Sequence, residues 1–209
     1  DNTQTFELNI PDKISCKVIA SSKNGLFITK TILESISGEE EFLDLELKLM
    51  SEIERIYLDE TDVLILEDPL IIEPSAIESI KRFLNEGGSI LWFAGENYKN
   101  INEQITSNLL LPSFKDQIML NDKSYLTVKV LDRKNPLLQD FNIRNLESSL
   151  PKIFRYNSVI LKKDHSLILD LNNNDPFLIN IPFYGSEIYF FTSPLDLKWN
   201  DFTMKGLLI

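Results

Sequence analysis

Cysteine and histidine are nearly absent from this chain of 209 residues, which contains only Cys16 and His165. A single cysteine excludes an internal disulfide, a zinc site built from several thiolates and a two-cysteine redox motif. Any Ser-His-Asp or Cys-His mechanism would have to use His165, which lies in the turn-like stretch KKDHS, far along the chain from Cys16. Cys16 lies inside an apolar run, where a cysteine is usually inert. We therefore expect no catalytic triad and assign no catalytic residue.

Basic residues are also scarce. The sequence has 21 Lys and Arg residues against 32 Asp and Glu residues, which makes its net charge -11. Such a chain repels phosphate backbones and anionic lipid surfaces unless a local basic patch intervenes. The basic pairs are scattered among acidic residues: Lys81-Arg82, Arg133-Lys134 and Lys162-Lys163. We therefore expect no nucleic-acid partner.

Long apolar runs are missing as well. No segment approaches the ~18 consecutive apolar residues of a membrane-spanning helix, and no signal peptide opens the chain. A hydrophobic content of 43% over this length supports a single globular domain, residues 1–209. Because the sequence begins without methionine and ends in the apolar stretch MKGLLI, we expect it to be an excerpt of a longer protein.

The first half of the chain alternates strand-like and helix-like patterns. The apolar run 14–20 predicts a strand, and the spacing of apolar residues over 26–37 predicts a helix after it. Leucine alternates with polar residues over 43–49, as in a strand with one wet face at or near a sheet edge. The runs 62–68 and 89–95 are typical of buried parallel strands.

Several helix signals agree over the stretch 74–88. Ser75 and Glu78 fit a capping box, Glu78 and Arg82 are spaced to pair across one turn, and Gly87-Gly88 provides a left-handed stop. With strands before and after this helix, the pattern predicts an α/β fold. We expect a doubly wound, mostly parallel sheet of the flavodoxin or amidotransferase type.

The second half of the chain is rich in strand-like segments. The runs predicted to be strands are 125–132, 159–163, 166–171, 176–183 and 187–193. Short helices are predicted over 101–112 and 142–152, and DLNNNDP (170–176) predicts a hairpin loop. That loop resembles a calcium loop in composition, but it lacks the glycine and the distal glutamate of one. We therefore expect no metal site, and no glycine-rich loop indicates a nucleotide or another cofactor.

A candidate ligand site lies at the predicted ends of two parallel strands. Glu67 and Asp68 end the first, and Gly95, Glu96 and Asn97 follow the second. Ligands of open α/β sheets bind at this edge, where crowded acids would raise a carboxyl pKa or attract a cation. The alternative interpretation is structural: Gly95 permits the turn, and an oxygen of Glu96 or Asn97 caps the segment after it.

Four phrases resemble a known family. They are DVLILEDP, SAIESIKRFLNEGGSILWFAGEN, KNPLLQDF and the closing DPFLINIPFYGSEIYFFTSPLDLKWNDFTMKGLLI. Together they are similar to the class I glutamine amidotransferase-like domain of bacterial aerotolerance-type (BatA-like) membrane proteins. The last phrase is the most specific, with Ser193, Pro194, Asp196, Trp199, Asn200 and Asp201.

The resemblance implies a location in the cell envelope, on the periplasmic face of the inner membrane. It also implies protein partners there and attachment to the membrane through flanking segments outside this chain. True amidotransferases carry a cysteine at the turn after a buried strand, whereas the corresponding turn here, FAGENY, has neither cysteine nor serine. No functional residue of the family is therefore carried over.

Three functions remain open from the sequence. The first is a non-catalytic amidotransferase-like domain that mediates protein contact or senses a ligand. The second is a hydrolase that uses carboxylates or a bound cation at the carboxyl edge of the sheet. The third is a domain that binds carbohydrate or peptide through Trp92 and Trp199, although Trp92 lies in an apolar strand typical of a core.

Overall fold

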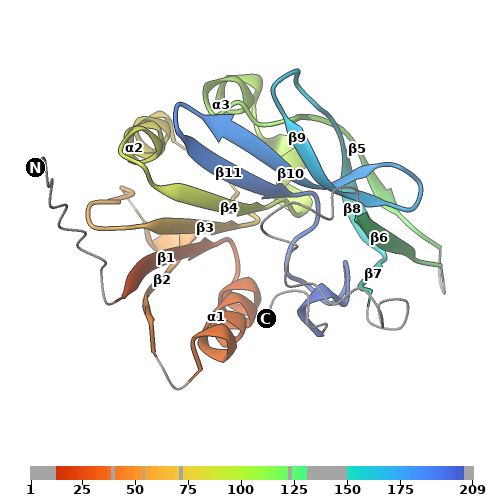
Figure 1. The fold of residues 1–209 in the computed structure, drawn as a ribbon, viewed down its shortest axis with the longest axis horizontal. Coiled ribbons are helices and arrows are strands. Elements are labelled where there is room, and N and C mark those ends of the chain that lie inside the picture. The colour runs from red at the N-terminus through yellow and green to blue at the C-terminus, as the bar shows by residue number, and fades with distance from the viewer. Residues whose placement is uncertain are drawn as a thin grey trace, which may run out of the picture.

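The computed structural model describes residues 13–38, 41–53, 55–70, 73–121, 124–130 and 150–204. Within these residues a nine-stranded sheet has the order β2-β1-β3-β4-β11-β10-β9-β6-β7, and β5 and β8 form a second, two-stranded sheet (Figure 1). The strands are β1 (Ile14–Ala20), β2 (Leu43–Leu49), β3 (Val63–Glu67), β4 (Ser89–Phe93), β5 (Ser113–Met119), β6 (Leu126–Val130), β7 (Lys152–Ile153), β8 (Arg155–Ile160), β9 (Ser166–Leu171), β10 (Pro176–Phe183) and β11 (Ser186–Phe191).

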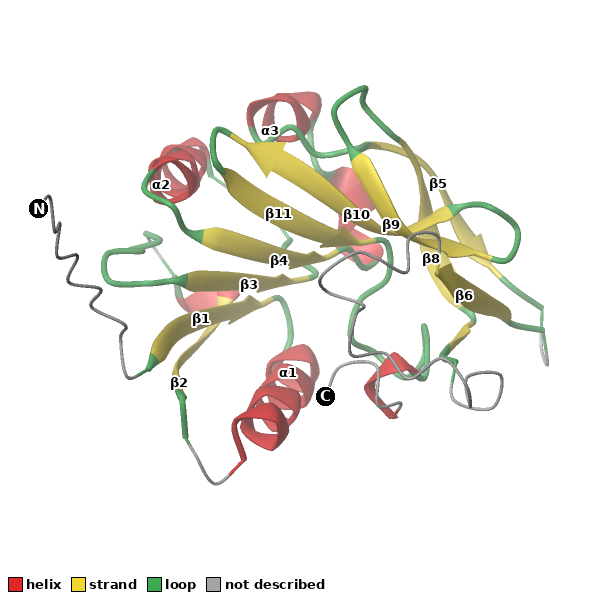
Figure 2. Cartoon of the chain, viewed as in Figure 1, coloured by secondary structure: helices red, strands yellow, loops and turns green. Residues whose placement is uncertain are grey.

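Few helices accompany these strands (Figure 2). The described α-helices are α1 (Lys23–Ser37), α2 (Pro74–Asn85) and α3 (Glu103–Asn108), and short 3-10 turns include η2 (Met50–Glu52), η3 (Glu96–Asn100) and η6 (Phe202–Met204). Two hydrophobic clusters cover opposite faces of the main sheet. Residues of α2 and α3 contribute to one cluster and residues of α1 to the other.

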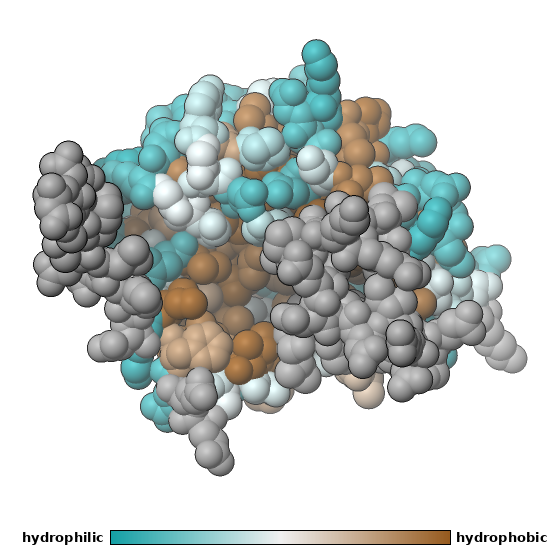
Figure 3. Space-filling model, in the orientation of Figure 1, coloured by the Kyte–Doolittle hydropathy of each residue, from teal (hydrophilic) through white to brown (hydrophobic). Residues whose placement is uncertain are grey.

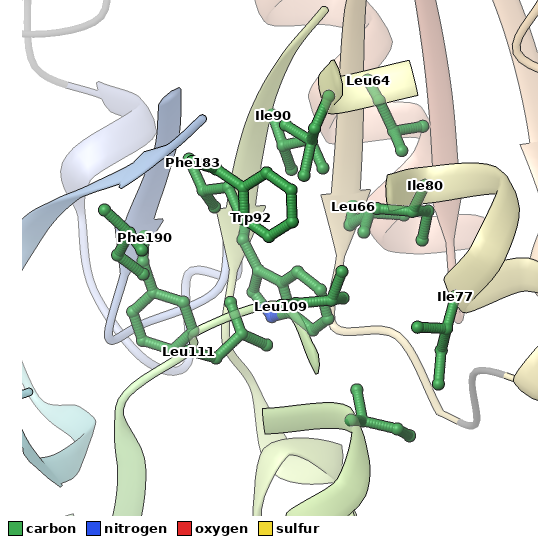
Figure 4. Packing of buried hydrophobic residues seen from close by; sticks show 14 of the residues in the cluster. Leu64, Leu66, Ile77, Ile80, Ile90, Trp92, Leu109, Leu111, Phe183 and Phe190 are labelled. Atoms are coloured by element: carbon green, nitrogen blue, oxygen red, sulfur yellow. The ribbon is translucent and has the colours of Figure 1, made fainter. Parts of the chain in front are cut away.

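The cluster on the α2 side is the larger (Figure 4). Trp92 and Ile90 of β4 point from the sheet toward Ile80 of α2, and all three side chains are fully buried. This location confirms that Trp92 is a core residue. On the opposite face, Figure 3 shows apolar surface next to α1, over the middle of the sheet.

The sheet is mixed, with a parallel part and an antiparallel part. Strands β2, β1, β3, β4 and β11 pair in parallel, whereas β10, β9, β6 and β7 continue the sheet through antiparallel pairs. The prediction of an α/β fold with a β-rich second half is confirmed. The prediction of a mostly parallel sheet holds only for the first part, because hairpins connect β9, β10 and β11, and a hairpin can join only antiparallel strands.

Most predicted strands lie where the sequence placed them. Strand β1 matches 14–20, β2 matches 43–49, and β2 ends one edge of the sheet among the described residues, as its alternation predicted. The hairpin loop 170–176 joins β9 to β10. Strand β5 was not predicted, since its polar residues hide the alternation. The predicted helix at 142–152 lies mostly outside the described residues.

The start of α2 differs from the predicted capping box. Pro74 occupies the first turn and the N-cap is Glu73, which makes no side-chain cap hydrogen bond. Proline begins the helix two residues earlier because its fixed φ suits the first turn and its missing N–H has no helical partner there. Glu78 pairs with Lys81 at 3.3 Å instead of Arg82, which lies 3.7 Å from Asp59.

Candidate functional site

The carboxyl ends of the parallel strands bring four loops together. Backbone hydrogen bonds of 2.9 to 3.0 Å join these loops. The N–H of Ser21 donates to the backbone carbonyl of Glu67, the N–H of Asp68 to that of Phe93, and the N–H of Ala94 to that of Phe191. The loops after β1, β3, β4 and β11 therefore form one continuous edge. This edge contains all five residues of the predicted ligand site.

Asp68 holds the turn after β4 in place. Its carboxylate accepts hydrogen bonds from the backbone N–H and the side-chain amide of Asn97, at 2.9 and 2.8 Å. Burial raises the pKa of Asp68 to about 6, although the N–H groups of Asn97 and Gly95 lower it. The cap thus comes from the neighbouring strand end. The prediction that an oxygen of Glu96 or Asn97 caps this segment is wrong, because Asn97 is the donor.

Gly95 is needed for the close approach of Asp68. A Cβ added at Gly95 would lie 2.7 Å from Asp68 Oδ1 and 2.8 Å from Asp68 Cβ. The φ of Gly95 is -106°, which other residues adopt readily. The glycine is therefore needed because it leaves space for the Asp68 carboxylate. The sequence pattern instead predicted that its backbone conformation permits the turn.

Glu67 is almost completely buried beneath the start of α1. Its side chain is 3% exposed, its Oε1 accepts the N–H of Leu195 at 3.0 Å, and its Oε2 has no hydrogen-bond partner among the described residues. A Cβ on Gly25 of α1 would lie 2.9 Å from Glu67 Cγ. Burial raises the pKa of Glu67 well above its ordinary value, and the charges of Asp68 and Asp196 raise it further.

Glu96 points away from these two acids. Its carboxylate pairs with Lys99 and with Arg155, and Arg155 also donates to Gln117. The guanidinium carbon of Arg155 lies 4.3 Å from the centroid of the Trp199 ring. The hydrogen bond from Lys99 and the charge of Arg155 lower the pKa of Glu96. The five predicted residues therefore share one edge but do not converge on one point.

Asn157 of β8 supports the same edge from the smaller sheet. Its side-chain amide donates to the carbonyls of Ala94 and Gly95 at 2.8 and 3.1 Å, and its own backbone N–H donates to Thr192. Gln117 of β5 donates to Asn157 Oδ1 at 3.2 Å. Sequence reasoning missed Asn157, Gln117 and Arg155. The property that distinguishes Asn157 is its complete burial within the strand RYNSVI. This burial depends on tertiary contacts, so the sequence does not reveal it.

The closing phrase of the sequence is built into the same region as a structural loop. The side-chain amide of Asn200 donates to Ser193 Oγ at 2.7 Å and to the Pro194 carbonyl at 2.8 Å. The N–H of Trp199 donates to the carbonyl of Asp196 at 2.8 Å. These bonds fold the chain after β11 back over the strand ends. The residues of this phrase therefore have a structural role.

Cys16 and His165 have separate surroundings. Cys16 is buried in β1, where desolvation raises the pKa of its thiol to about 11. His165 lies between β8 and β9, where its Nε2 is 2.7 Å from the Leu110 carbonyl and its Nδ1 accepts the N–H of Lys162. Burial lowers the pKa of His165. Neither residue contacts the strand-end acids.

The described residues contain no group of three or more His, Cys, Asp or Glu side chains placed to hold a metal ion. In the 170–176 loop, Asp175 accepts hydrogen bonds from the Tyr156 hydroxyl and the Asn173 amide. The loop therefore binds its own neighbours in the way of an ordinary hairpin loop.

Comparisons with known proteins give a fold but no family. No family model matches the chain, and no curated protein matches it. Among solved structures, Cytoplasmic Protein STM1381 from Salmonella typhimurium LT2 matches 91% of this chain and 93% of its own, with a TM-score of 0.70 and 16% identity. Cytoplasmic Protein STM3548 from Salmonella typhimurium matches 90% of this chain and 94% of its own, with a TM-score of 0.66 and 16% identity.

A third match is a putative ThuA-like protein from Bacteroides uniformis ATCC 8492. It covers 98% of this chain and 92% of its own, with a TM-score of 0.64 and 11% identity. This match supports the coarser prediction of an amidotransferase-like α/β fold. At such identities the likeness concerns the fold alone.

The resemblance to BatA-like membrane proteins is wrong. The similar structures include the two Salmonella proteins and ThuA-like proteins, and the described part of the closing phrase forms a structural loop. The phrase KNPLLQDF lies outside the described residues. The predicted location at the periplasmic face of the inner membrane is contradicted too, since both Salmonella proteins are described as cytoplasmic. Among the described residues, no helix is long and apolar enough to cross a membrane.

Proposed function

We propose that this chain is a non-catalytic α/β domain that binds a small ligand or a protein partner. Its parallel part is a doubly wound, amidotransferase-like sheet, with α1 on one face and α2 on the other. One observation supports this function above the others: the polar groups at the carboxyl edge are used to hold the edge together. Asp68 caps the turn after β4, and Glu96 pairs with Lys99 and Arg155.

The surroundings of the candidate nucleophiles support the same proposal. Nucleophilic catalysis needs a base within hydrogen-bond reach of the nucleophile. Cys16 is buried inside β1 with a raised thiol pKa, and His165 is bonded to backbone groups of Lys162 and Leu110. Neither residue activates the other in this arrangement.

One observation favours the alternative function, a hydrolase that uses carboxylates. Glu67 has one oxygen without a partner among the described residues and a pKa well above its ordinary value. Both properties occur in general acids. Its burial under α1 argues against this role, because a general acid must reach the substrate.

Hydrolysis assays distinguish the two functions. Generic ester, amide and glycoside substrates are offered to the parent protein and to the Glu67→Gln and Glu96→Gln variants. We expect the same background rate in all three proteins. A parent rate above background that disappears in Glu67→Gln would overturn the non-catalytic function.

A further inference from the structure

A cleft lies on the α2 side of the sheet, and none of the five predicted carboxyl-edge residues lines it. It has a volume of about 660 Å³ and lies between β1, β2 and the connecting segment 52–57. Strands β1 and β2 pair in parallel with Lys17 opposite Glu46, so Lys17, Glu46 and Lys48 share one face of the sheet. Ligand sites in proteins have volumes of ~300–1,000 Å³, which includes this cleft.

The floor of the cleft is held by the ammonium group of Lys17. The Lys17 side chain is 12% exposed, and its Nζ lies 2.8 Å from Glu46 Oε2 and donates to the Tyr57 carbonyl. The first contact ties β1 to β2, and the second holds Tyr57 of the connecting segment against the sheet. The floor is therefore organised in the absence of a ligand.

Two further cations line the cleft with donors to spare. Lys48 is half exposed and lies 3.7 Å from Glu46, a carboxylate that it shares with Lys17. Arg55 is exposed, and no carboxylate of the described residues lies within ion-pair distance of it. The hydrogen bond from Lys17 and the charge of Lys48 lower the pKa of Glu46.

The charge of the lining is opposite to that of the whole chain. Among the described lining residues, three cations, Lys17, Lys48 and Arg55, face two carboxylates, Glu46 and Glu52, which leaves one positive charge. The complete chain has a net charge of -11. A local reversal of this kind favours an anionic ligand.

Apolar groups complete the cleft. Ile53 of the connecting segment is half-buried and Tyr57 is exposed, and both line the cleft, whereas Ile19 and Ile56 lie buried beneath them. Because the Ile53 side chain and the Tyr57 ring are apolar, they favour a ligand with a hydrocarbon or aromatic part. A purely hydrated ion would leave this surface unused.

We propose that this cleft binds a small organic carboxylate, a monoanion with an apolar or aromatic body. Lys48 and Arg55 hold the carboxylate, and Ile53 and the Tyr57 ring contact the body. Arginine suits this role because its fork matches the two oxygens of a carboxylate. The carboxylates of Glu46 and Glu52 disfavour a phosphate dianion. The inference rests on the proposed binding function and names a ligand class for it.

Titration with benzoate tests the inference. Benzoate, benzamide, benzylamine and inorganic phosphate are added to the protein while amide NMR signals and the melting temperature are followed. We expect benzoate alone to shift signals of 46–57, with a dissociation constant on the order of 1 mM for so small a ligand. Benzamide keeps the ring without the charge, so it isolates the contribution of the carboxylate.

Variants locate the binding. Lys48→Gln and Arg55→Gln each remove one exposed cation, and we expect each to weaken benzoate binding by about tenfold. Lys163→Gln, an exposed cation in the β8–β9 turn, is the matched control and should leave binding unchanged. Circular dichroism establishes that the variants are folded.

Three results would overturn the inference: no benzoate binding, equal binding of benzamide, or benzoate binding that survives the Lys48→Gln and Arg55→Gln double substitution. Phosphate binding stronger than benzoate binding would indicate another ligand class and would also overturn the inference. These results leave the non-catalytic function standing. Hydrolysis that depends on Glu67 would reject that function and leave the benzoate titration unaffected.

Discussion

Two adjacent acids at the end of β3 have opposite roles because their surroundings differ. Asp68 accepts hydrogen bonds from Asn97 and fixes the turn after β4. Glu67 points the other way, into the protein beneath α1, and keeps one oxygen without a partner among the described residues. Glu67 is the last residue of β3, whereas Asp68 follows it with a left-handed φ of +45°, and this turn directs its side chain toward the loop after β4.

Gly95→Ala should destabilise the protein strongly, because the added methyl overlaps the Asp68 side chain. We expect a loss of ~1–3 kcal/mol, typical of an overpacked site. Urea unfolding of the single variants and of Gly95→Ala with Asp68→Gly measures the coupling. If the clash is the cause, the double variant is more stable than the sum of the two losses predicts. Additive losses would contradict this explanation.

Glu67 should make stability depend on pH. Its pKa in the folded protein is raised, so the folded state keeps the proton where the unfolded chain, with a pKa of about 4.3, has lost it. Unfolding then releases a proton, and stability falls as the pH rises from about 4.3 toward the folded-state pKa. Glu67→Gln removes this dependence and keeps an acceptor for the N–H of Leu195.

Urea unfolding of the parent and of Glu67→Gln between acidic and neutral pH measures this effect. We expect the free energy of unfolding of Glu67→Gln, relative to the parent, to increase steadily as the pH rises. Asp68, whose pKa is raised to about 6, is present in both proteins, so its effect cancels in the comparison. A difference that is constant over this range would contradict the raised pKa of Glu67.

At the scale of elements, α2 shows how a small local feature sets a boundary. The spacing of Ser75 and Glu78 suits a capping box, but Pro74 starts the helix and the Glu73 carbonyl accepts the N–H groups of Ala76 and Ile77. The stop at Gly87 was predicted correctly, since its φ of +101° is left-handed. Helix ends are set by single residues, so one proline outweighs a two-residue pattern.

Ser75→Ala should therefore cost little. A serine at a true N-cap contributes ~1 kcal/mol, whereas an exposed serine inside the first turn contributes less than ~0.5 kcal/mol. The control is Ser22→Ala, because Ser22 is the N-cap of α1 and its hydroxyl accepts the N–H of Gly25. Thermal unfolding should show a clear loss for Ser22→Ala alone. Equal losses of stability in Ser75→Ala and Ser22→Ala would instead support a capping box at Ser75.

At the scale of the whole molecule, the small sheet is joined to the large one through polar contacts. Asn157 of β8 donates to two carbonyls after β4, and Arg155 of the same strand pairs with Glu96 and stacks on Trp199. Glu96 of the carboxyl edge thus has a partner 59 residues away in the chain. These contacts make the edge a junction between the two sheets.

Asn157→Ala should weaken this junction by ~1–3 kcal/mol, because it removes the side-chain donor of two buried carbonyls. The Gly95 carbonyl keeps the N–H of Tyr98 at 3.3 Å, so the main loss falls on the Ala94 carbonyl. Asn157→Asp should be at least as damaging, since a carboxylate keeps the shape but loses both donors. Gln117→Ala is the control, with a smaller expected loss because Gln117 is only half buried. Urea unfolding measures all three. Losses of equal size for Asn157→Ala and Gln117→Ala would contradict the importance of the buried carbonyls.

Local patterns in the sequence determined most of the elements. The alternation over 43–49 predicted an edge strand, because burial of one face selects apolar residues at a period of two. The apolar runs 62–68 and 89–95 predicted buried strands, because burial of both faces selects a continuous apolar run. These properties depend on neighbours within a few residues, so they can be inferred from the sequence.

Only the tertiary structure decided how the strands pair and what the strand-end acids do. Whether Glu67 is buried, whether Asp68 caps a loop, and which cation meets Glu96 depend on β8, β11 and α1, which are distant in the chain. Lys17 and Arg55 line one cleft for the same reason. Hydrogen bonding and desolvation act over a few ångströms in space, and sequence separation carries no information about that distance.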